Sequence, residues 1–226
     1  MKRFYKIVTV GPDRGILLDG RPVRTPARAP LILPTDRLAQ AVAAEWAAQP
    51  EEIDPRAMPM TGLANAAIDQ VAPDSAAFAA TLAPYAETDV LTSRADDPPE
   101  LIAREEAAWD PLLDWARTRY DVHFELATGI RHRAQPPATV TRLAEALAAR
   151  DPFALAAMMP LVTIGGSLVT ALAVAEGAIS PDAAFDATHA DELWQAERWG
   201  EDYLATDARA ARRADFVAAA RFLTLA

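Results

Sequence analysis

Two residues near the carboxyl end of the sequence have side chains that could do chemistry together. His189 and Glu192 lie three positions apart, about one turn of an α-helix, so both can point to the same side. Such a pair could act as a general acid and base, or could share a metal ion. The sequence nominates no nucleophile and no third ligand to accompany them. A small helical enzyme or metal-binding protein that uses Glu192 and His189 is therefore one open interpretation of the chain.

The sequence lacks several motifs that are typical of enzymes. It contains no Gly-Lys-Ser/Thr phosphate loop, no G-x-G-x-x-G fingerprint, no G-x-S-x-G nucleophile elbow and no H-E-x-x-H zinc helix. It has three histidines and no cysteine, which excludes disulfides, thiolate metal sites and cysteine nucleophiles. The usual catalytic signatures are therefore missing, and the three histidines leave little material for a metal site.

Glu192 also lies on a stripe of mainly apolar side chains. At 100° per residue, one helical face carries Phe185, His189, Glu192, Ala196, Trp199 and Tyr203, with Gln195 at its edge. We expect this face to be buried. A carboxylate beside aromatic rings is costly unless it is hydrogen-bonded or paired. Glu192 is then either a satisfied structural anchor or part of a surface that binds a partner.

The composition indicates a globular protein. Its 226 residues are 51% hydrophobic and 24% charged, enough for one large domain or two small ones with real cores. A formal net charge of -10 and a pI near 4.8 argue against a nucleic-acid binder. The start of the chain lacks the apolar core of a signal peptide. With Met1 in place we expect a bacterial cytoplasmic protein, or a mitochondrial matrix form whose targeting segment has been removed.

One uncharged run has the length of a membrane span. Residues 152–175 contain no charged side chain, and such a run could cross a bilayer. Pro160 and Gly165-Gly166 interrupt it, however, and no cluster of Lys or Arg marks a cytoplasmic side. We therefore predict a pair of buried helices that meet near the two glycines, without stable membrane insertion. A membrane-associated assembly factor is the alternative.

The order of secondary-structure signals predicts an α+β fold. Short apolar runs on either side of Asp19-Gly20, a favoured turn dipeptide, predict a hairpin, and Thr35 can cap the first long helix. After Asp74 nearly every signal is helical. We expect a small N-terminal β-containing two-layer domain over residues 1–85, followed by an all-α orthogonal helical bundle over residues 86–226.

Two groups in the first third of the chain have both a structural and a functional interpretation. Trp46 could anchor its helix against the sheet or could form part of an interface. Arg21, Arg24 and Arg28 near the hairpin could bind an anion or could be the solvated face of a strand. The residues themselves leave these alternatives open.

The order of several short motifs resembles one known family. The motifs are Arg3-Phe4-Tyr5-Lys6, Leu18-Asp19-Gly20-Arg21-Pro22, Glu45-Trp46, Met58-Pro59-Met60-Thr61, Thr88-Asp89, Trp109-Asp110-Pro111 and Glu192-x-x-Gln195-x-x-x-Trp199-Gly200. In this order they resemble the F-type ATP synthase assembly chaperones that hold the unassembled α subunit. The resemblance covers roughly residues 3–203, and its specificity comes from the series.

The resemblance implies a non-enzymatic, ATP-independent chaperone with a β-containing N-terminal domain and an orthogonal helical bundle. It also implies no cofactor, no bound metal and no small-molecule substrate. Its partner would be the unassembled α subunit of the F₁ sector, which it would keep from aggregating until that subunit joins β. Glu192, Gln195 and Trp199 match the family's C-terminal motif, and Trp46 matches its Glu-Trp motif. The resemblance therefore implies that these four residues bind the partner, with Glu192 either contacting the client or bracing the fold.

Overall fold

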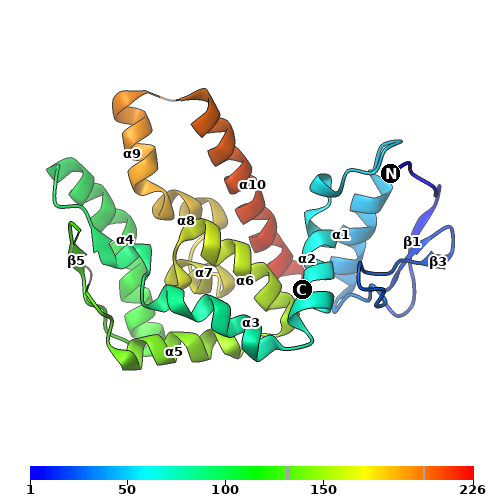
Figure 1. Ribbon diagram of the computed structural model, residues 1–226, viewed down its shortest axis with the longest axis horizontal. Helices are drawn as coiled ribbons and strands as arrows, with labels where there is room; N and C mark the ends of the chain where they lie inside the picture. Colours follow the sequence, from blue (N-terminus) through cyan, green and yellow to red (C-terminus); the bar gives the residue numbers. More distant parts are fainter. Residues whose placement is uncertain (131–132, 201) are drawn as a thin grey trace. The chain divides into compact units, whose positions relative to one another are not determined.

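The structure, a computed structural model, describes residues 1–130, 133–200 and 202–226. These residues form two compact units (Figure 1). The first unit contains Met1–Phe78, Asp151–Ala157 and Ala218–Ala226, and the second contains Ala79–Arg150 and Met158–Val217. The division into an α+β domain over residues 1–85 and a helical bundle over residues 86–226 stays a prediction.

Three short antiparallel strands form the sheet of the first unit. They are β1 (Val8–Val10), β2 (Ile16–Leu18) and β3 (Arg21–Pro22), in the order β1-β2-β3. Asp19 and Gly20 connect β2 to β3 with φ angles of 49° and 78°. Two successive positive φ angles are what a type I′ turn requires, and Asp-Gly supplies them at low cost. The predicted hairpin is confirmed.

Two helices cover the next part of the first unit. They are α1 (Asp36–Ala47) and α2 (Pro59–Ala66), with the 3₁₀ turn η1 (Pro55–Ala57) before α2 and the π-helical turn η2 (Ala67–Val71) after it. Thr35 caps α1 as predicted, because its Oγ1 accepts a hydrogen bond from Leu38 N at 3.1 Å. The same hydroxyl donates to the carbonyl oxygen of Leu225. The start of α1 is thus fixed by the C-terminal segment as well.

Segments far apart in the sequence share the core of the first unit. Its buried members include Ile16, Leu31, Leu33, Leu38, Val42, Met60, Ala157 and Phe222. The rings of Phe153 and Phe222 stack with their centroids 6.3 Å apart. Burial of these apolar side chains against the sheet explains why the last nine residues belong to the first unit.

Helices dominate the remainder of the chain. The helical elements are α3 (Ser75–Leu82), η3 (Ala83–Ala86), η4 (Val90–Thr92), α4 (Pro99–Tyr120), α5 (Pro137–Ala148), α6 (Pro152–Gly165), α7 (Leu168–Ala175), α8 (Pro181–Thr188), α9 (Ala190–Trp199) and α10 (Tyr203–Leu225). Two short parallel strands, β4 (Ser93–Arg94) and β5 (Ala127–Thr128), pair within the second unit. Strands at the start and helices after them confirm the α+β class.

The predicted helix pair over residues 152–175 is also confirmed. The helix α6 ends at Gly165, and α7 begins after Ser167, whose Oγ accepts a hydrogen bond from Thr170 N at 2.9 Å. Between them Gly166 has a φ of 63°, a conformation that glycine adopts without strain. Among the described residues no helix is both long and apolar enough to cross a membrane.

Asp89 joins the start of α7 to the segment before α4. Its side chain is fully buried, and its carboxylate accepts hydrogen bonds from Val169 N at 2.9 Å and Leu91 N at 3.1 Å. Burial raises the pKa of Asp89 to about 6, although the two hydrogen bonds by themselves lower it. A buried carboxylate that satisfies helix amides is a structural brace.

Trp109 lies in the core of the second unit, as its place on the apolar face of α4 would suggest. It is 1% exposed, and its Nε1 donates a hydrogen bond to the carbonyl oxygen of Ala187 at 2.6 Å. This bond satisfies the polar atom of the indole and ties α4 to α8. Because α9 follows α8 directly, this bond also helps to position the start of α9.

Candidate partner-binding site

The C-terminal aromatic stripe is only partly buried, so the expectation of one buried helical face is wrong. Phe185 and His189 are buried, whereas Trp199 and Tyr203 are 70% and 76% exposed. The chain is not one helix here, because α8, α9 and α10 cover the stripe in turn. Gly200 ends α9 with a φ of 91°. Because the breaks between these helices interrupt the helical repeat, the side chains of the stripe do not share one face.

Glu192 is paired with two arginines of α10. Its Oε2 accepts a hydrogen bond from Arg212 Nη2 at 2.6 Å, and its Oε1 lies 3.5 Å from Arg209 Nη1. The Glu192 side chain is 35% exposed. The carboxylate is therefore both satisfied within the fold and accessible from outside. The sequence pattern alone does not assign Arg209 and Arg212 a role, although their spacing places both on one face of a helix.

A small hollow lies between α9 and α10 beside this ion pair. It has a volume of about 250 Å³, and Glu192, Gln195, Trp199 and Arg209 are among the residues that line it. Gln195 is exposed. The structure thus brings three of the four predicted partner-binding residues together at one accessible place.

Trp46, the fourth predicted residue, belongs to the first unit. It is half-buried on α1, and its ring meets the Tyr5 ring edge to face at 5.7 Å. The Tyr5 hydroxyl donates to the carbonyl oxygen of Trp46 at 2.7 Å. Trp46 lines a cavity of about 490 Å³, here called the hairpin hollow, together with Phe4, Tyr5, Leu18, Arg21 and Arg24 among others. Both interpretations of Trp46 are therefore compatible with its position.

The glutamate of the Glu-Trp motif has a structural contact of its own. Glu45 accepts hydrogen bonds from Met60 N at 2.7 Å, Thr61 N at 2.8 Å and Thr61 Oγ1 at 2.7 Å. Met58, the residue that precedes α2, makes no side-chain cap bond. Glu45 therefore supplies the N-terminal cap of α2 from a neighbouring helix, where a negative charge is favourable.

His189 is held in a way that suits a core residue. It is 8% exposed, its ring stacks on Phe185 with the centroids 3.8 Å apart, and its Nδ1 lies 2.9 Å from the carbonyl oxygen of Phe185. Burial lowers the pKa of His189. Over the described residues no group of three or more His, Asp or Glu side chains is placed to hold a metal ion. Within the part of the chain that the structure describes, no third side chain is placed to complete a metal site with His189 and Glu192.

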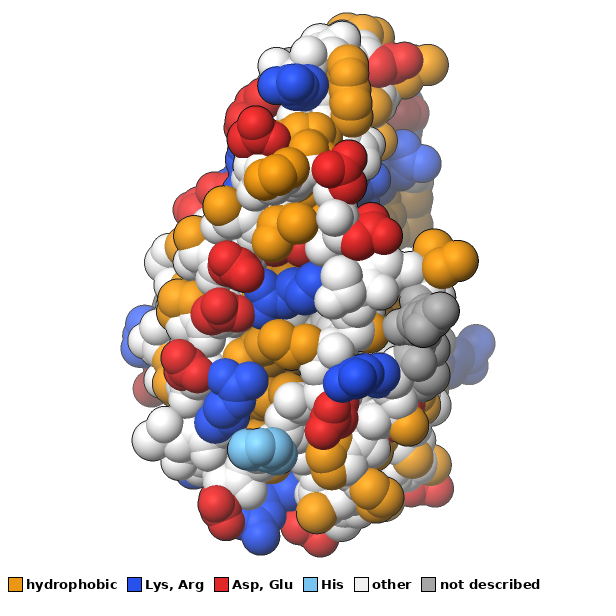
Figure 2. Space-filling model, turned by 90° about the vertical axis from the view of Figure 1, so that its left-hand side faces the viewer, with side chains coloured by type: hydrophobic (Ala, Val, Ile, Leu, Met, Phe, Trp, Pro, Cys, Tyr) orange, Lys and Arg blue, Asp and Glu red, His pale blue; other side chains and the backbone are white. Residues whose placement is uncertain are grey.

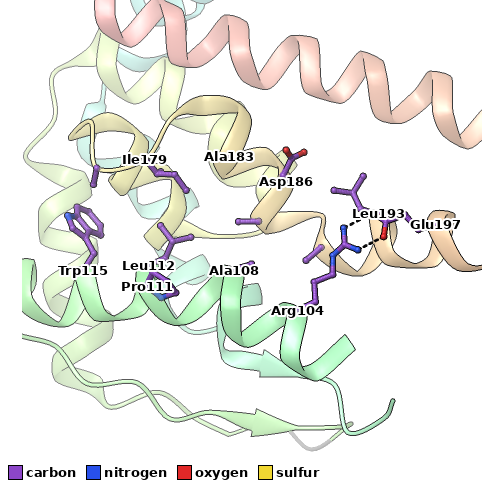
Figure 3. A pocket seen from close by; sticks show the side chains of 13 residues that line it. Arg104, Ala108, Pro111, Leu112, Trp115, Ile179, Ala183, Asp186, Leu193 and Glu197 are labelled. Atoms are coloured by element: carbon purple, nitrogen blue, oxygen red, sulfur yellow. Dashed lines mark hydrogen bonds and ion pairs between the residues drawn. The ribbon is translucent and has the colours of Figure 1, made fainter. Parts of the chain in front are cut away.

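A larger apolar groove lies on the other side of α9, between α4 and α8. It has a volume of about 800 Å³, and Figure 3 shows Trp115 and Ile179 at one end and Arg104 with Glu197 at the other. Arg104 donates to both carboxylate oxygens of Glu197, at 2.6 and 2.9 Å. Figure 2 shows hydrophobic side chains along the middle of one face, interrupted by acidic and basic ones. The sequence did not identify this groove, because it forms only where three helices meet.

Two carboxyl groups meet where α9 begins beside α4. Glu105 is fully buried, and its Oε2 accepts a hydrogen bond from Ala95 N at 2.8 Å, while its Oε1 has no donor among the described residues. Burial raises the pKa of Glu105 to about 7, and the carboxyl of Asp191 adds to the rise. The Ala95 N–H and the charge of Arg94 act in the opposite direction. A proton between the two carboxyl groups lets them hydrogen-bond.

Glu105→Gln is expected to raise the melting temperature at pH 8 and to leave it nearly unchanged at pH 5. The side chain ionises near pH 4.5 when unfolded and near 7 when folded, so the wild-type free energy of unfolding falls as the pH rises between these values. Glutamine has no charge to desolvate and can donate to Asp191 while accepting from Ala95 N. Thermal melts from pH 5 to 8 check this, and parallel curves for both proteins would contradict it.

An exposed aromatic helix end with apolar hollows beside it is typical of proteins that bind other proteins. The sequence model of the ATP12 chaperone protein family matches residues 2–117. The crystal structure of Atp12 from Paracoccus denitrificans is 43% identical, with a TM-score of 0.94 over 99% of this chain and 97% of that one. A solved structure from Agrobacterium tumefaciens is 41% identical, with a TM-score of 0.93 over 99% of this chain and 85% of that one.

The chain belongs to the ATP12 chaperone family, whose members are ATP synthase assembly chaperones. The family that the motif series resembled is thereby confirmed. Its fold is shared over nearly the whole length, including the α9 and α10 region that lies beyond the family match.

Proposed function

We propose that this protein binds the unassembled α subunit of the F₁ sector of ATP synthase and prevents its aggregation until α joins β. The observation that carries the proposal is the exposed end formed by α9 and α10. Trp199, Tyr203 and Leu204 are 70%, 76% and 74% exposed there, close in sequence and all large and apolar. A soluble chain rarely leaves such a group uncovered unless a partner binds to it. We call these three residues the aromatic end.

A polar anchor lies next to the aromatic end. Glu192 and Gln195 line the hollow that Trp199 also lines, and Glu192 is accessible although Arg212 and Arg209 pair with it. An arginine or backbone amide of the client could share this carboxylate, which has two oxygens and room for further donors. Interface hot spots are enriched in large aromatic side chains such as Trp and Tyr, and Glu192 would add a charge-assisted contact beside them.

The proposed action is binding alone. A chaperone that binds only the unassembled client lowers the concentration of free client by mass action, and this needs no ATP and no catalysis. We place the action in the bacterial cytoplasm, or in the mitochondrial matrix for an organellar form. Release would follow when the β subunit competes for the same client surface.

Replacing Trp199 and Tyr203 together with Ser is expected to weaken protection of the α subunit at least about tenfold, because hot-spot aromatics each contribute about 2 kcal/mol. The melting temperature should change little, since both side chains are exposed. The measurement is light scattering of purified α diluted from denaturant, with increasing amounts of each chaperone variant.

The matched control replaces Leu126 and Ile130 with Ser, because these apolar residues are also exposed and lie in the same unit. It should protect α as the wild type does. Equal loss of protection in both double variants would show that general surface hydrophobicity acts, and would remove the aromatic end from the account.

A further inference from the structure

The charges of the chain are strongly segregated. The first 30 residues contain seven Lys or Arg and two Asp, whereas the remaining residues contain 15 basic and 30 acidic side chains. The N-terminal hairpin region is therefore cationic within a protein whose net charge is -10. Such an asymmetry indicates a surface that attracts an anionic partner.

Several of these cations are not neutralised within the fold. Lys2 lies 3.7 Å from Glu51, and Arg3 and Arg14 donate to backbone carbonyl groups. In the described parts of the chain, Lys6, Arg21, Arg24 and Arg28 form no ion pair. The side-chain hydrogen bond found among them runs from Arg24 to the carbonyl oxygen of Arg28 at 2.9 Å. All four are exposed. The charges of Lys6 and Arg21 help to lower the pKa of Asp19, so Asp19 partly offsets these two, while Arg24 and Arg28 have no such neighbour among the described residues.

Two of the exposed arginines line the hairpin hollow. Arg21 and Arg24 are there beside the apolar side chains of Phe4, Leu18 and Trp46. The hollow therefore offers both cationic donors and apolar walls to one ligand.

The acidic side chain that lines the hollow is already occupied. Asp19 accepts hydrogen bonds from Ile7 N at 2.8 Å and Lys6 N at 3.1 Å, and these bonds lower its pKa. Its carboxylate holds the start of the chain against the turn. The side chains that can still engage a ligand with charge are therefore the two arginines.

Two apolar residues that line the hollow, Met1 and Phe4, and the nearby Ile7 are strongly exposed. Met1, Phe4 and Ile7 are 78%, 66% and 63% exposed. Lys2 and Lys6 lie among them in the sequence, so this edge has a mixed apolar and cationic character. A partner that matches it carries both apolar and acidic side chains.

We propose that the hairpin hollow binds an extended acidic segment of the client polypeptide. An apolar side chain of the segment enters the hollow between Phe4 and Trp46, and a neighbouring carboxylate pairs with Arg21 and Arg24, whose planar guanidinium groups suit carboxylates. A concave site of about 490 Å³ accommodates a side chain, whereas a lipid surface would require no such concavity. This inference rests on the proposed function, since it specifies which kind of client segment the hairpin hollow beside Trp46 would bind.

An array of overlapping peptides from the host's own α subunit tests this. The wild-type protein should bind a set of peptides enriched in Asp and Glu next to apolar residues. The peptide-binding signal of the double variant R21E/R24E should be at least about tenfold weaker than that of the wild type, because reversal of two contact charges replaces attraction with repulsion. Binding should also weaken between low and high salt.

The matched control is R37E/R56E, which makes the same change of net charge at two exposed arginines of the first unit that form no ion pair among the described residues. It should bind the peptides as the wild type does. The inference is overturned if no peptide binds, if the bound peptides are neutral or basic, or if both double variants lose the same signal. The inference is also overturned, in favour of a membrane surface, if the wild type binds anionic vesicles but no peptide and R21E/R24E loses the vesicle binding.

Capture of the full-length α subunit separates this inference from the proposed function. If R21E/R24E and the wild type capture free α equally, the hairpin hollow has no part in binding and the proposed function stands. If the wild type captures no free α, the proposed function itself fails, whatever the peptides show.

Discussion

Glu192→Lys is expected to reduce capture of the free α subunit at least about tenfold while the protein stays folded. A lysine at this position faces Arg212 and Arg209, which now hold the carboxylate, so three cations would meet between α9 and α10. The repulsion separates the two helices that form the aromatic end, and the anchor for a client donor is lost. Because the ion pairs are partly exposed, their loss should cost about 1–2 kcal/mol, or about 2–8 °C in melting temperature.

Two further variants separate a client contact from a brace. Glu192→Gln keeps the size and removes the charge, so lost capture with wild-type melting would indicate contact with the client. The double variant E192K/R212E restores an ion pair with the opposite orientation. Recovery of capture in this variant would assign Glu192 to bracing α9 against α10, whereas continued loss supports direct contact. Unchanged capture by Glu192→Lys would remove the residue from both roles.

Asp89→Ala is expected to destabilise the second unit strongly. The variant leaves two buried donors, Val169 N and Leu91 N, without acceptors, and it removes the link between α7 and the segment before α4. Orphaned buried donors cost about 1–3 kcal/mol each, so we expect a loss of about 3 kcal/mol and a melting temperature about 6–12 °C lower. Calorimetry or circular dichroism during heating measures this.

Asp89→Asn serves as the conservative comparison. Its carbonyl oxygen can still accept one of the two hydrogen bonds, while its amide group meets the other donor, so an intermediate loss is expected. A melting temperature of Asp89→Ala within about 2 °C of the wild type would contradict the role of Asp89 as a brace.

The sequence allowed the elements that depend on neighbouring residues to be predicted. The Asp19-Gly20 turn, the Thr35 cap and the helix pair joined near Gly165-Gly166 all follow from the φ angles and hydrogen bonds of a few adjacent residues. The assignment of residues 152–175 to two helices succeeded for the same reason. A left-handed Gly166 and a capping Ser167 end the run before it can span a bilayer.

The candidate site depends on contacts that no local pattern contains. Glu192 was recognisable as an unusual carboxylate, but its partners Arg209 and Arg212 lie in another helix, reached through the turn at Gly200. The helical period of 3.6 residues predicted that Trp199 would lie on a buried face. In the structure, where α9 ends at Gly200, the Trp199 side chain is 70% exposed. Exposure of an aromatic group is decided by tertiary packing, which a helical wheel does not represent.

The groove and the hairpin hollow could not be predicted from the sequence for a related reason. The groove that holds Trp115 and Leu193 and the hairpin hollow beside Trp46 each collect residues from several elements. Only the motif series, which reflects the whole fold at once, connected Trp46 with Glu192. That these two residues act on the same client remains a prediction.

Affinity capture of the tagged protein from its own host is the most direct test of the central claim. The account predicts enrichment of the α subunit without the β subunit or the assembled F₁ sector, and loss of that enrichment with folded Glu192→Lys. Capture of the assembled complex, or no enrichment of α in cells that contain free α, would contradict it.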